Sequence, residues 1–373
     1  MRVVIVGAGI SGMCAAWSLI KLGHQVTLID QGPIPNPLSA SGDQHRNIRR
    51  AYGPMDNYAR AMDQAFDAWE ELWADLGENH LVNCGILSIS QREGDGGDVA
   101  RESLMRHKRP FVDLAPKEAA ERYPFLDPNG IRRVVFTPEG GVLLCQKIGA
   151  GLNEWLSRNG AELRPNTLVS GVDLKAGAIT LASGETLSAD HVVVTVGAWT
   201  PKLLPGISKP LTTYRAIAVY LDTPAKLTEA WTKAPGIQAI GGDRPGYGLP
   251  PVAGTELKIA SVAFRRPTND ADADRVAQNS EAAGTLEVFG VVLKDIRAYG
   301  VKRVYTCAYT FTNDEHFWRH WEGKGVVVSA CSGHGYKYGA AIGRWIGWAV
   351  DRKDGALLNS WLRAEAEPPR VRA

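Results

Sequence analysis

The chain begins with RVVIVGAGISG, residues 2–12, in which an apolar, β-branched run leads into a glycine-rich turn. Residues 13–22 then have the pattern of a helix, and residues 26–29 form a second strand-like run that ends at Asp30. This order of strand, G-x-G-x-x-G turn, helix, strand and acid is typical of a dinucleotide-binding unit, in which the carboxylate accepts hydrogen bonds from ribose hydroxyls. The stretch therefore predicts a Rossmann-type nucleotide-binding fold.

Each residue of the turn has a physical task in this interpretation. Gly7 makes the tight turn, Gly9 lets the backbone approach a pyrophosphate, and Gly12 allows the helix to pack closely on the strand. Ile10 and Ser11 lie in the first helical turn, whose free N–H groups and partial positive charge attract phosphates. A purely structural glycine turn is the alternative, and the pattern alone does not separate FAD from NAD.

Composition narrows the class of protein. The 373 residues leave room for two domains or one large interleaved one, and 45% hydrophobic residues are ample for a core. A net charge of +2 without a Lys/Arg-rich run argues against a nucleic-acid partner, and no long uncharged apolar stretch predicts a membrane helix. The five scattered cysteines lack C-x-x-C spacing, so we expect no disulfide, no metal and a cytoplasmic location.

The order of predicted elements suggests a discontinuous domain. Strands near both ends frame a strand-rich middle, which favours an α/β chain whose nucleotide domain is assembled from separate segments around an inserted domain. We expect the nucleotide domain over 1–80, 145–210 and 320–373. The substrate domain is expected over 81–144 and 211–319.

The elements expected along the chain follow from periodicity and turn signals. We expect helices over 13–22, 55–76, 116–123, 146–158 and 338–350. We expect strands over 2–6, 26–29, 83–90, 161–163, 167–174, 178–181, 191–196, 212–221, 257–264, 303–312 and 325–329. Residues 31–43 and 92–98 are expected to be irregular loops.

Two further strand ends carry a nucleotide signal. The strand 191–196 runs into Gly197-Ala198-Trp199, where small residues let the backbone pass beside a cofactor, although a strand that ends in Gly is also ordinary. The strand 326–329 is followed by ACSGHGYKY, residues 330–338, and then by a helix. The glycines permit the turn. The N-terminus of the helix that follows carries a partial positive charge, which the helix dipole directs toward any group bound beyond it.

Six motifs follow one another along the chain. They are the N-terminal fingerprint, RNIRRAYG (46–53), YGLP (247–250), LKI (257–259), CAYT (307–310) with DEHF (314–317), and SGHGYK (332–337). With them, nearly the whole chain resembles the amine-oxidising flavoproteins related to D-amino-acid oxidase. More narrowly, it resembles the family of monomeric sarcosine oxidase, N-methyltryptophan oxidase, pipecolate oxidase and the nikkomycin-pathway imine oxidase.

The resemblance implies a fold and a reaction. The fold is a Rossmann-type FAD-binding domain with an inserted substrate domain that is built on a mixed β-sheet. The reaction is oxidation of a secondary or cyclic amino acid, with hydride transfer to flavin N5, release of an imine, and reoxidation by O2 to H2O2. The family offers monomers, so we expect a monomer whose partners are a small amino acid or amine and O2.

The resemblance also implies which residues contact FAD. They are Gly7, Gly9, Ile10, Ser11, Gly12, Asp30, Arg46, Val169, Gly197, Trp199, Cys307, Gly333, His334, Gly335 and Lys337. In the family a Cys at the position of Cys307 holds FAD covalently as an 8α-thioether; the alternative is a small thiol that packs as a hydrophobe. From the residues alone, His334 bonds either to the backbone or to the flavin, and His191 and His316 are expected in loops or at the surface.

The remaining implied roles concern catalysis. A Lys at the position of Lys258 sits over the flavin in the family and promotes reaction with oxygen, since a cation stabilises superoxide as it forms. The alternative is a lysine on an edge strand whose charged end reaches out to solvent. Arg49 and Lys337 match the residues around the substrate carboxylate, and Arg46 matches an arginine that tunes the flavin. The alternative for the arginines is a solvated basic loop or a pyrophosphate contact.

Tyr247 and Tyr309 match residues that line the substrate cavity, although each could be a packed aromatic.

The chain also departs from the family pattern. Val262 stands where sarcosine oxidase has a His, and Gln44-His45 stands where the family has one Thr. These changes predict a more apolar or larger substrate pocket.

Other functions stay open at this point. An amine dehydrogenase with another electron acceptor, a specialised biosynthetic imine or amine oxidase, and a non-catalytic flavoprotein are the alternatives.

Overall fold

The N-terminal stretch forms a βαβ unit in the computed structural model, which describes residues 1–242, 244–329 and 331–367. Strand β1 (Arg2–Val6), helix α1 (Ile10–Lys21) and strand β2 (Gln25–Ile29) follow one another, and the two strands pair in parallel. Both faces of β1 are buried, as a continuous apolar run in a parallel sheet requires. The nucleotide-binding topology that the sequence predicts is confirmed at this end of the chain.

The first sheet collects strands from the whole length of the chain. Its order is β20-β21-β13-β1-β2-β9, and the pairings are parallel except for β20 with β21. The added strands are β9 (Glu162–Arg164), β13 (His191–Val194), β20 (Trp318–Glu322) and β21 (Gly325–Ser329). The carboxyl ends of β1, β13 and β21 therefore meet at one edge, where the glycine-rich turns follow.

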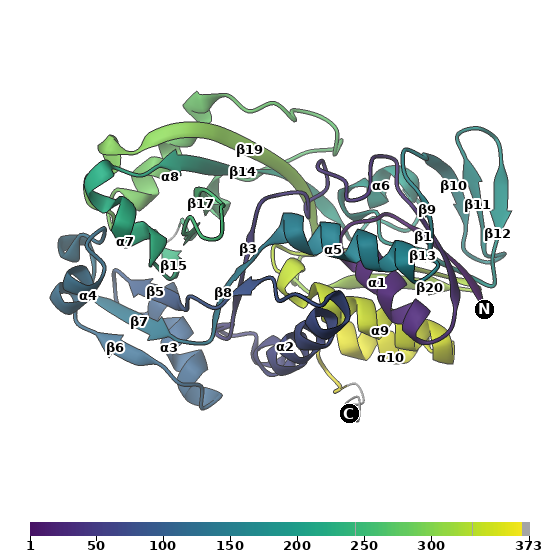
Figure 1. Cartoon of the computed structure of the whole chain (residues 1–373), viewed down its shortest axis with the longest axis horizontal. Coiled ribbons are helices and arrows are strands. Elements are labelled where there is room, and N and C mark those ends of the chain that lie inside the picture. The colour runs from purple at the N-terminus through teal and green to yellow at the C-terminus, as the bar shows by residue number, and fades with distance from the viewer. Residues whose placement is uncertain (243, 330, 368–373) are drawn as a thin grey trace.

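Helices cover one face of this sheet and a small sheet covers the other (Figure 1). Val3 and Ile5 pack in a core with the helices, while Val4 and Val6 pack toward the small sheet. The helices are α1, α2 (Asp56–Leu76), α5 (Cys145–Arg158), α9 (Gly339–Arg352) and α10 (Gly355–Leu362). The small sheet is formed by β10 (Val169–Asp173), β11 (Ala178–Leu181) and β12 (Thr186–Ser188).

Small residues bring α1 and α9 into close contact. A Cβ atom on Gly343 would overlap Cys14, and one on Gly347 would overlap the Ser18 hydroxyl. Bare backbone at these two positions is therefore what lets α9 lie against the helix that begins at the nucleotide fingerprint.

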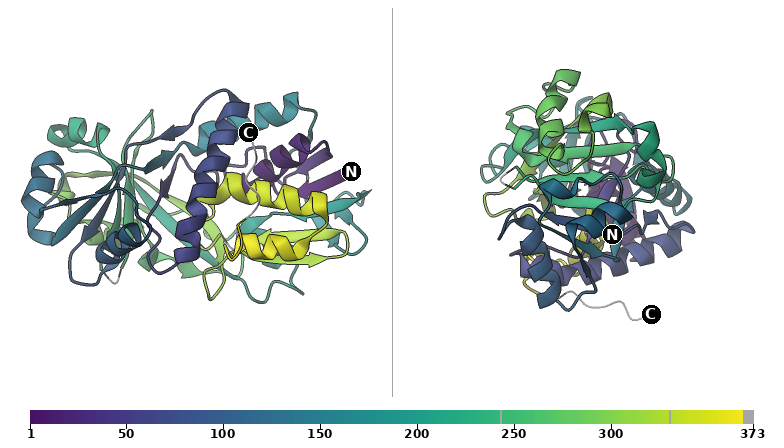
Figure 2. Two further views of the ribbon diagram at one scale, coloured as in Figure 1. Left: turned by 90° about the horizontal axis from the view of Figure 1, so that it is seen from below. Right: turned by 90° about the vertical axis from the view of Figure 1, so that its left-hand side faces the viewer.

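A nine-stranded sheet forms the other half of the molecule, at the left in both Figure 1 and the first view of Figure 2. Its order is β18-β14-β17-β16-β15-β5-β7-β6, and β19 pairs with β14. Its strands are β5 (Ile86–Ser90), β6 (Val112–Leu114), β7 (Arg133–Thr137), β14 (Thr212–Asp222), β15 (Gly236–Ile240), β16 (Gly246–Leu249), β17 (Leu257–Ser261), β18 (Arg266–Pro267) and β19 (Gly300–Phe311).

Shorter elements complete the fold. The helices are α3 (Gly96–Arg106), α4 (Pro116–Arg122), α6 (Thr200–Leu203), α7 (Thr228–Thr232) and α8 (Ala282–Phe289). A three-stranded sheet, β3 (Arg46–Arg49), β8 (Gly140–Leu143) and β4 (Leu81–Val82), lies apart from the two large sheets in the pairing pattern. Helix α8 packs against β14, β16 and β17.

The mixed α/β architecture is confirmed, and several expected elements differ in detail. The prediction of a loop over 92–98 is wrong for its last residues, because α3 begins at Gly96. The Asp95 carboxylate caps this helix by accepting from the N–H groups of Gly97 and Asp98. The strand expected over 257–264 ends at Ser261, whose hydroxyl accepts from the Ala263 N–H and starts a 3₁₀ turn.

Other elements were absent from the sequence prediction. The basic segment 46–49 is strand β3, paired with β8, and the hairpin of β15 and β16 was not expected. His191 is not at the surface: it is 4% exposed in β13 and packs against Trp321. The domain boundaries stay a prediction, and residues 368–373, with which the predicted nucleotide domain ends, lie outside the described residues.

Two absences characterise the described part of the chain. Among residues 1–242, 244–329 and 331–367, no helix is both long and apolar enough to cross a membrane. In the same part of the chain, no three His, Cys, Asp or Glu side chains gather into a group that could hold a metal ion.

Candidate functional site

A cavity of about 1110 Å³ brings the separate sequence motifs together. It is lined by the N-terminal fingerprint, by β3 and the residues after it, by the face of β14, β16, β17 and β19, and by the C-terminal glycine turn. The parallel sheet and the nine-stranded sheet thus both contribute wall residues. A site of this size and mixed lining is typical of a cofactor together with a substrate.

Most of the predicted site residues line this cavity. They are Gly7, Gly9, Ile10, Ser11, Asp30, Arg46, Arg49, Val169, Gly197, Trp199, Tyr247, Cys307, Tyr309, Gly333, His334, Gly335 and Lys337. Two of the predicted residues are not in the lining. Gly12 lies against the Gly7 carbonyl, where a Cβ atom would overlap it, and Lys258 lies behind the wall.

The nucleotide end of the cavity has room for phosphate. A Cβ atom on Gly9 would meet nothing closer than the Ser41 Oγ at 3.6 Å, and one on Gly197 would meet no atom within 4 Å. A side chain at either position would project into this open space. The first turn of α1 supplies its N–H groups there, and the Ile10 N–H donates to Ser41 Oγ at 3.0 Å. These features fit the pyrophosphate of a dinucleotide.

Asp30 is fixed by the backbone around it. Its carboxylate accepts from the N–H groups of Ala8 (2.8 Å) and Gly32 (2.9 Å) and from the Asn36 amide (2.8 Å). A carboxylate has about four acceptor positions, so one stays available for a ribose hydroxyl. The position predicted from the sequence therefore fits ribose recognition.

His334 secures the C-terminal turn. Its Nε2 lies 2.9 Å from the Glu315 carbonyl and so carries the proton, which leaves Nδ1 to accept from the Tyr52 hydroxyl at 2.8 Å. The ring also stacks on Phe317, with 4.6 Å between centroids. Burial, together with nearby Lys337, lowers the pKa of His334 to about 3, so the imidazole stays neutral. Both nitrogens are occupied, which fits a role in holding the turn.

Arg49 and Lys337 lie on the cavity wall without an acidic partner. Their charged groups lie 5.2 and 5.6 Å from the centre of the Tyr52 ring. Arg49 donates to the Ala51 carbonyl, and Lys337 Nζ lies 3.4 Å from the His334 carbonyl. No described carboxylate forms an ion pair with either. Burial lowers the pKa of both groups, and for Lys337 the charge of Arg49 lowers it further. A half-buried arginine and a buried lysine without an acidic partner could together hold an anion.

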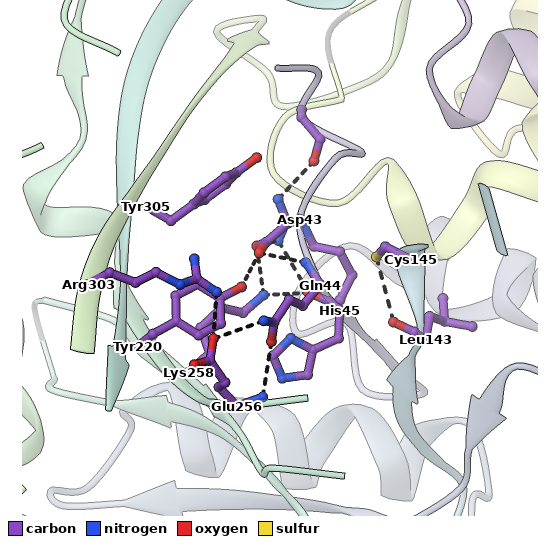
Figure 3. A network of polar contacts seen from close by, with 12 residues as sticks. Asp43, Gln44, His45, Leu143, Cys145, Tyr220, Glu256, Lys258, Arg303 and Tyr305 are labelled. Atoms are coloured by element: carbon purple, nitrogen blue, oxygen red, sulfur yellow. Dashed lines mark hydrogen bonds and ion pairs between the residues drawn. The ribbon is translucent and has the colours of Figure 1, made fainter. Parts of the chain in front are cut away.

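A second pair of cations is compensated. Asp43 binds the Arg46 guanidinium and lies 2.9 Å from Lys258 Nζ, and Figure 3 shows the carboxylate at the centre of this network. Arg46 and Asp43 line the cavity, whereas Lys258 is fully buried behind them. Asp43 was not predicted as a site residue, because it stands at the end of a segment expected to be an irregular loop. Its place three residues before Arg46 was the available signal.

The β19 strand presents its predicted face to the cavity. Cys307, Tyr309 and Phe311 alternate along the strand and all line the cavity, as does Tyr247 of β16. Burial raises the pKa of Cys307, with Arg46 acting in the opposite direction. Val262 also lines the cavity, so an apolar side chain occupies the wall where the family pattern has an imidazole.

Comparison with known proteins gives a consistent result. The profile of the family described as FAD dependent oxidoreductase matches residues 2–348. Monomeric sarcosine oxidase of Bacillus sp. (strain B-0618) is 27% identical over 362 residues, covering 91% of this chain and 90% of that protein. N-methyl-L-tryptophan oxidase of Yersinia pestis (strain Pestoides F) is 26% identical over 354 residues, covering 91% and 92%.

A similar fold is found among solved structures. NikD, described as an unusual amino acid oxidase essential for nikkomycin biosynthesis, superimposes with a TM-score of 0.82 at 18% identity. The match covers 95% of this chain and 94% of that one.

Proposed function

The chain belongs to the FAD dependent oxidoreductase family, and on this premise we propose that it oxidises a secondary or cyclic amino acid, such as an N-methyl amino acid or a proline- or pipecolate-like ring. Bound FAD would supply a hydride acceptor for the carbon beside the substrate nitrogen, so that the substrate would leave as an imine, and O2 would take up the electrons to give H2O2. The names of the sarcosine and N-methyltryptophan oxidases support this substrate class.

The observation that carries the proposal is the uncompensated pair Arg49 and Lys337. A substrate carboxylate would receive a two-pronged contact from the Arg49 guanidinium and a point charge from Lys337. The Tyr52 ring lies within cation–π distance of both cations. A carboxylate bound here would remove the cost of burying two like charges side by side, so the pair favours acids over simple amines.

The other wall groups position the substrate rather than exchange protons with it. Burial raises the pKa of Tyr247 to about 12 and raises that of Tyr309, so both hydroxyls stay protonated at neutral pH. His334 is neutral with both nitrogens engaged. We therefore propose that the amine enters unprotonated. Val262 supplies an apolar wall for the carbon substituents on or near the nitrogen.

Three finer points belong to the same proposal. We propose that FAD is attached through Cys307, which lines the cavity beside Tyr309 on β19. We propose that the protein acts as a monomer in the cytoplasm. None of the five cysteines forms a disulfide, as a reducing compartment favours.

One observation favours a second candidate function. Lys258, the residue expected to promote reaction with oxygen, donates to Asp43 and does not line the cavity. An amino acid dehydrogenase that passes its electrons to another carrier has no need of a cation at the flavin. Mixing the anaerobically reduced protein with air-saturated buffer in a stopped-flow instrument separates the two, since fast reoxidation supports the oxidase and slow reoxidation the dehydrogenase.

The deciding experiment is peroxide production in air from a substrate panel. The panel holds sarcosine, N-methyltryptophan, L- and D-pipecolate, L-proline and a secondary amine without a carboxylate. Turnover of at least one acid but not of the amine is the expected result. Turnover of the amine alone would contradict the carboxylate site. If no compound of the panel yields peroxide and none reduces the flavin under anaerobic conditions, the proposed substrate class is contradicted.

A further inference from the structure

Lys258 depends on one carboxylate. Its side chain, from β17, is 0% exposed, and Nζ lies 2.9 Å from Asp43 Oδ2 and also donates to the His45 carbonyl. Glu256, the nearest acid along the strand, is instead bound by Lys302 at 2.9 Å and Arg303 at 2.6 Å. Among the described residues, Asp43 is thus the carboxylate that forms an ion pair with Lys258.

Asp43 is itself held on every side. It is 2% exposed and accepts from Arg46, Lys258 and the Tyr220 hydroxyl, while its Oδ1 also accepts from the Gln44 N–H at 2.8 Å. Burial alone would raise the pKa of Asp43, but Arg46 and Lys258 lower it well below its usual value. A carboxylate with all its acceptor positions filled is a fixed negative charge rather than a base.

The cavity therefore has two cation pairs of opposite character. Arg49 and Lys337 have no acid and are free to take an anion, whereas Arg46 and Lys258 share Asp43. Figure 3 shows the shared carboxylate between the segment before β3 and the strands β14 and β17, so that it joins two parts of the cavity wall.

We propose that Asp43 is a positioning residue for the oxygen half of the reaction: it anchors the Lys258 ammonium behind the cavity wall and keeps it charged. The proposal rests on the proposed function in two respects: that the cavity holds FAD, and that O2 reoxidises it with the help of Lys258. Asp43 touches neither substrate nor oxygen in this role, and it acts through Lys258.

The surroundings of Lys258 explain why the anion is needed. The titratable groups that interact with it are Asp43, His45, Arg46, Cys145, Tyr220 and Cys307. Burial, together with the charge of Arg46, lowers the pKa of Lys258 to about 8 even though Asp43 raises it. Of these groups, Asp43 is the one that carries a negative charge at neutral pH. Without it, the lysine loses its proton at lower pH and is mostly neutral at pH 8.

The test compares Asp43→Asn with wild-type holoenzyme by two readouts. The first is the side-chain NMR signal of Lys258 in protein labelled with ¹³Cε-lysine, assigned by its disappearance in Lys258→Met and followed from pH 5 to 10. The second is the rate of reoxidation by O2 over the same pH range after reduction with dithionite. Neither readout needs an amine substrate, so failure of the proposed substrate class leaves this test intact.

In Asp43→Asn we expect the Lys258 pKa to fall by at least one unit. A fall of one unit from about 8 lowers the charged fraction at pH 8 from about one half to about one tenth. The reoxidation rate at pH 8 then falls by about fivefold, or by more for a larger shift, and recovers as the pH is lowered. Glu281→Gln, which breaks the partly buried ion pair with Arg215 on β14, is the control and is expected to leave both profiles unchanged.

Two results would overturn the proposal. One is an Asp43→Asn protein whose lysine signal and reoxidation profile match those of wild type. The other is available from wild type alone, should Asp43→Asn not fold: a Lys258 signal that is already neutral at pH 7. Asp43→Glu, which keeps the negative charge, is expected to retain a reoxidation profile closer to wild type than to Asp43→Asn.

Discussion

At the scale of single residues, the cations at the cavity differ in whether an acidic side chain pairs with them. Arg50 lies next to Arg49 in the chain but binds Asp63 at 2.6 Å and Glu139 at 3.1 Å. Arg49 has no such acid and lines the cavity. Two adjacent arginines can thus have unrelated roles, and the one without an acidic partner is the one available to a ligand.

Replacing Arg49 removes half of the proposed carboxylate site. We expect Arg49→Ala to lower kcat/KM for an acid substrate by roughly 30- to 700-fold, corresponding to about 2–4 kcal/mol for one partner of a buried charge pair. Steady-state peroxide assays give the value. Arg50→Ala is the matched control, and an equal loss in both variants would argue against a carboxylate contact at Arg49.

Replacing Cys307 tests the flavin linkage. We expect Cys307→Ser to release its FAD into the supernatant on acid precipitation, because serine does not form the thioether, while wild type keeps its flavin in the pellet. Absorbance of the two fractions at the flavin band gives the result. Cys84→Ser controls for loss of a thiol elsewhere, and flavin retained in the Cys307→Ser pellet would refute the linkage.

At the scale of elements, the contact between α1 and α9 supports the nucleotide site. Helix α1 begins at the fingerprint, and its position depends on bare backbone in α9. The strand β3 has a similar task on the substrate side, since its pairing with β8 sets Arg46 opposite Leu143 and Arg49 opposite Gly140. Secondary structure thus determines which cations reach the cavity.

The helix contact can be tested by adding one carbon atom. We expect Gly343→Ala to lower the free energy of unfolding by about 1–3 kcal/mol, because its Cβ would overlap Cys14 and force the helices apart. Urea unfolding followed by circular dichroism gives the value. Gly206→Ala is the control, since a Cβ there meets no atom within 4 Å, and it should change stability by no more than about 0.5 kcal/mol.

At the scale of the whole molecule, buried neutral histidines make stability depend on pH. Burial, with a smaller effect of Lys353, lowers the pKa of His191 from 6.5 to about 4. Between these values the unfolded chain binds a proton that the folded chain does not. The folded state is therefore less favoured as the pH falls through this window and regains stability as the pH rises above 6.5.

Replacing His191 should make the acid loss less steep. We expect His191→Phe, which keeps a ring against Trp321, to lose up to about 3 kcal/mol less than wild type between pH 6.5 and 4. Urea unfolding at a series of pH values gives both curves. The comparison at pH 8, where His191 is neutral in either state, isolates the packing cost, and parallel curves below pH 6.5 would contradict the assignment.

The nucleotide unit was readable from the chain because its signals are local. Strand, glycine turn, helix and acid lie within residues 2–30, and each follows from the conformational freedom of glycine or from periodic burial. The β19 face that carries Cys307 and Tyr309 was predictable for the same reason, since alternation along a strand fixes which side chains share a face. Helix α3 was missed because its first turn contains Gly96 and Gly97, which are poor helix formers.

The charge pairing was not readable from any such pattern. Asp43 and Lys258 lie 215 positions apart, and Tyr220 lies 177 positions from the same carboxylate. Whether a cation is paired depends on which strands the fold brings beside it, and no local periodicity carries that information. The chain alone indicates a dinucleotide site and the residue types around it. The packing of two sheets leaves Arg49 and Lys337 open to an anion and ties Lys258 to Asp43, because long-range contacts alone determine which buried charges are compensated.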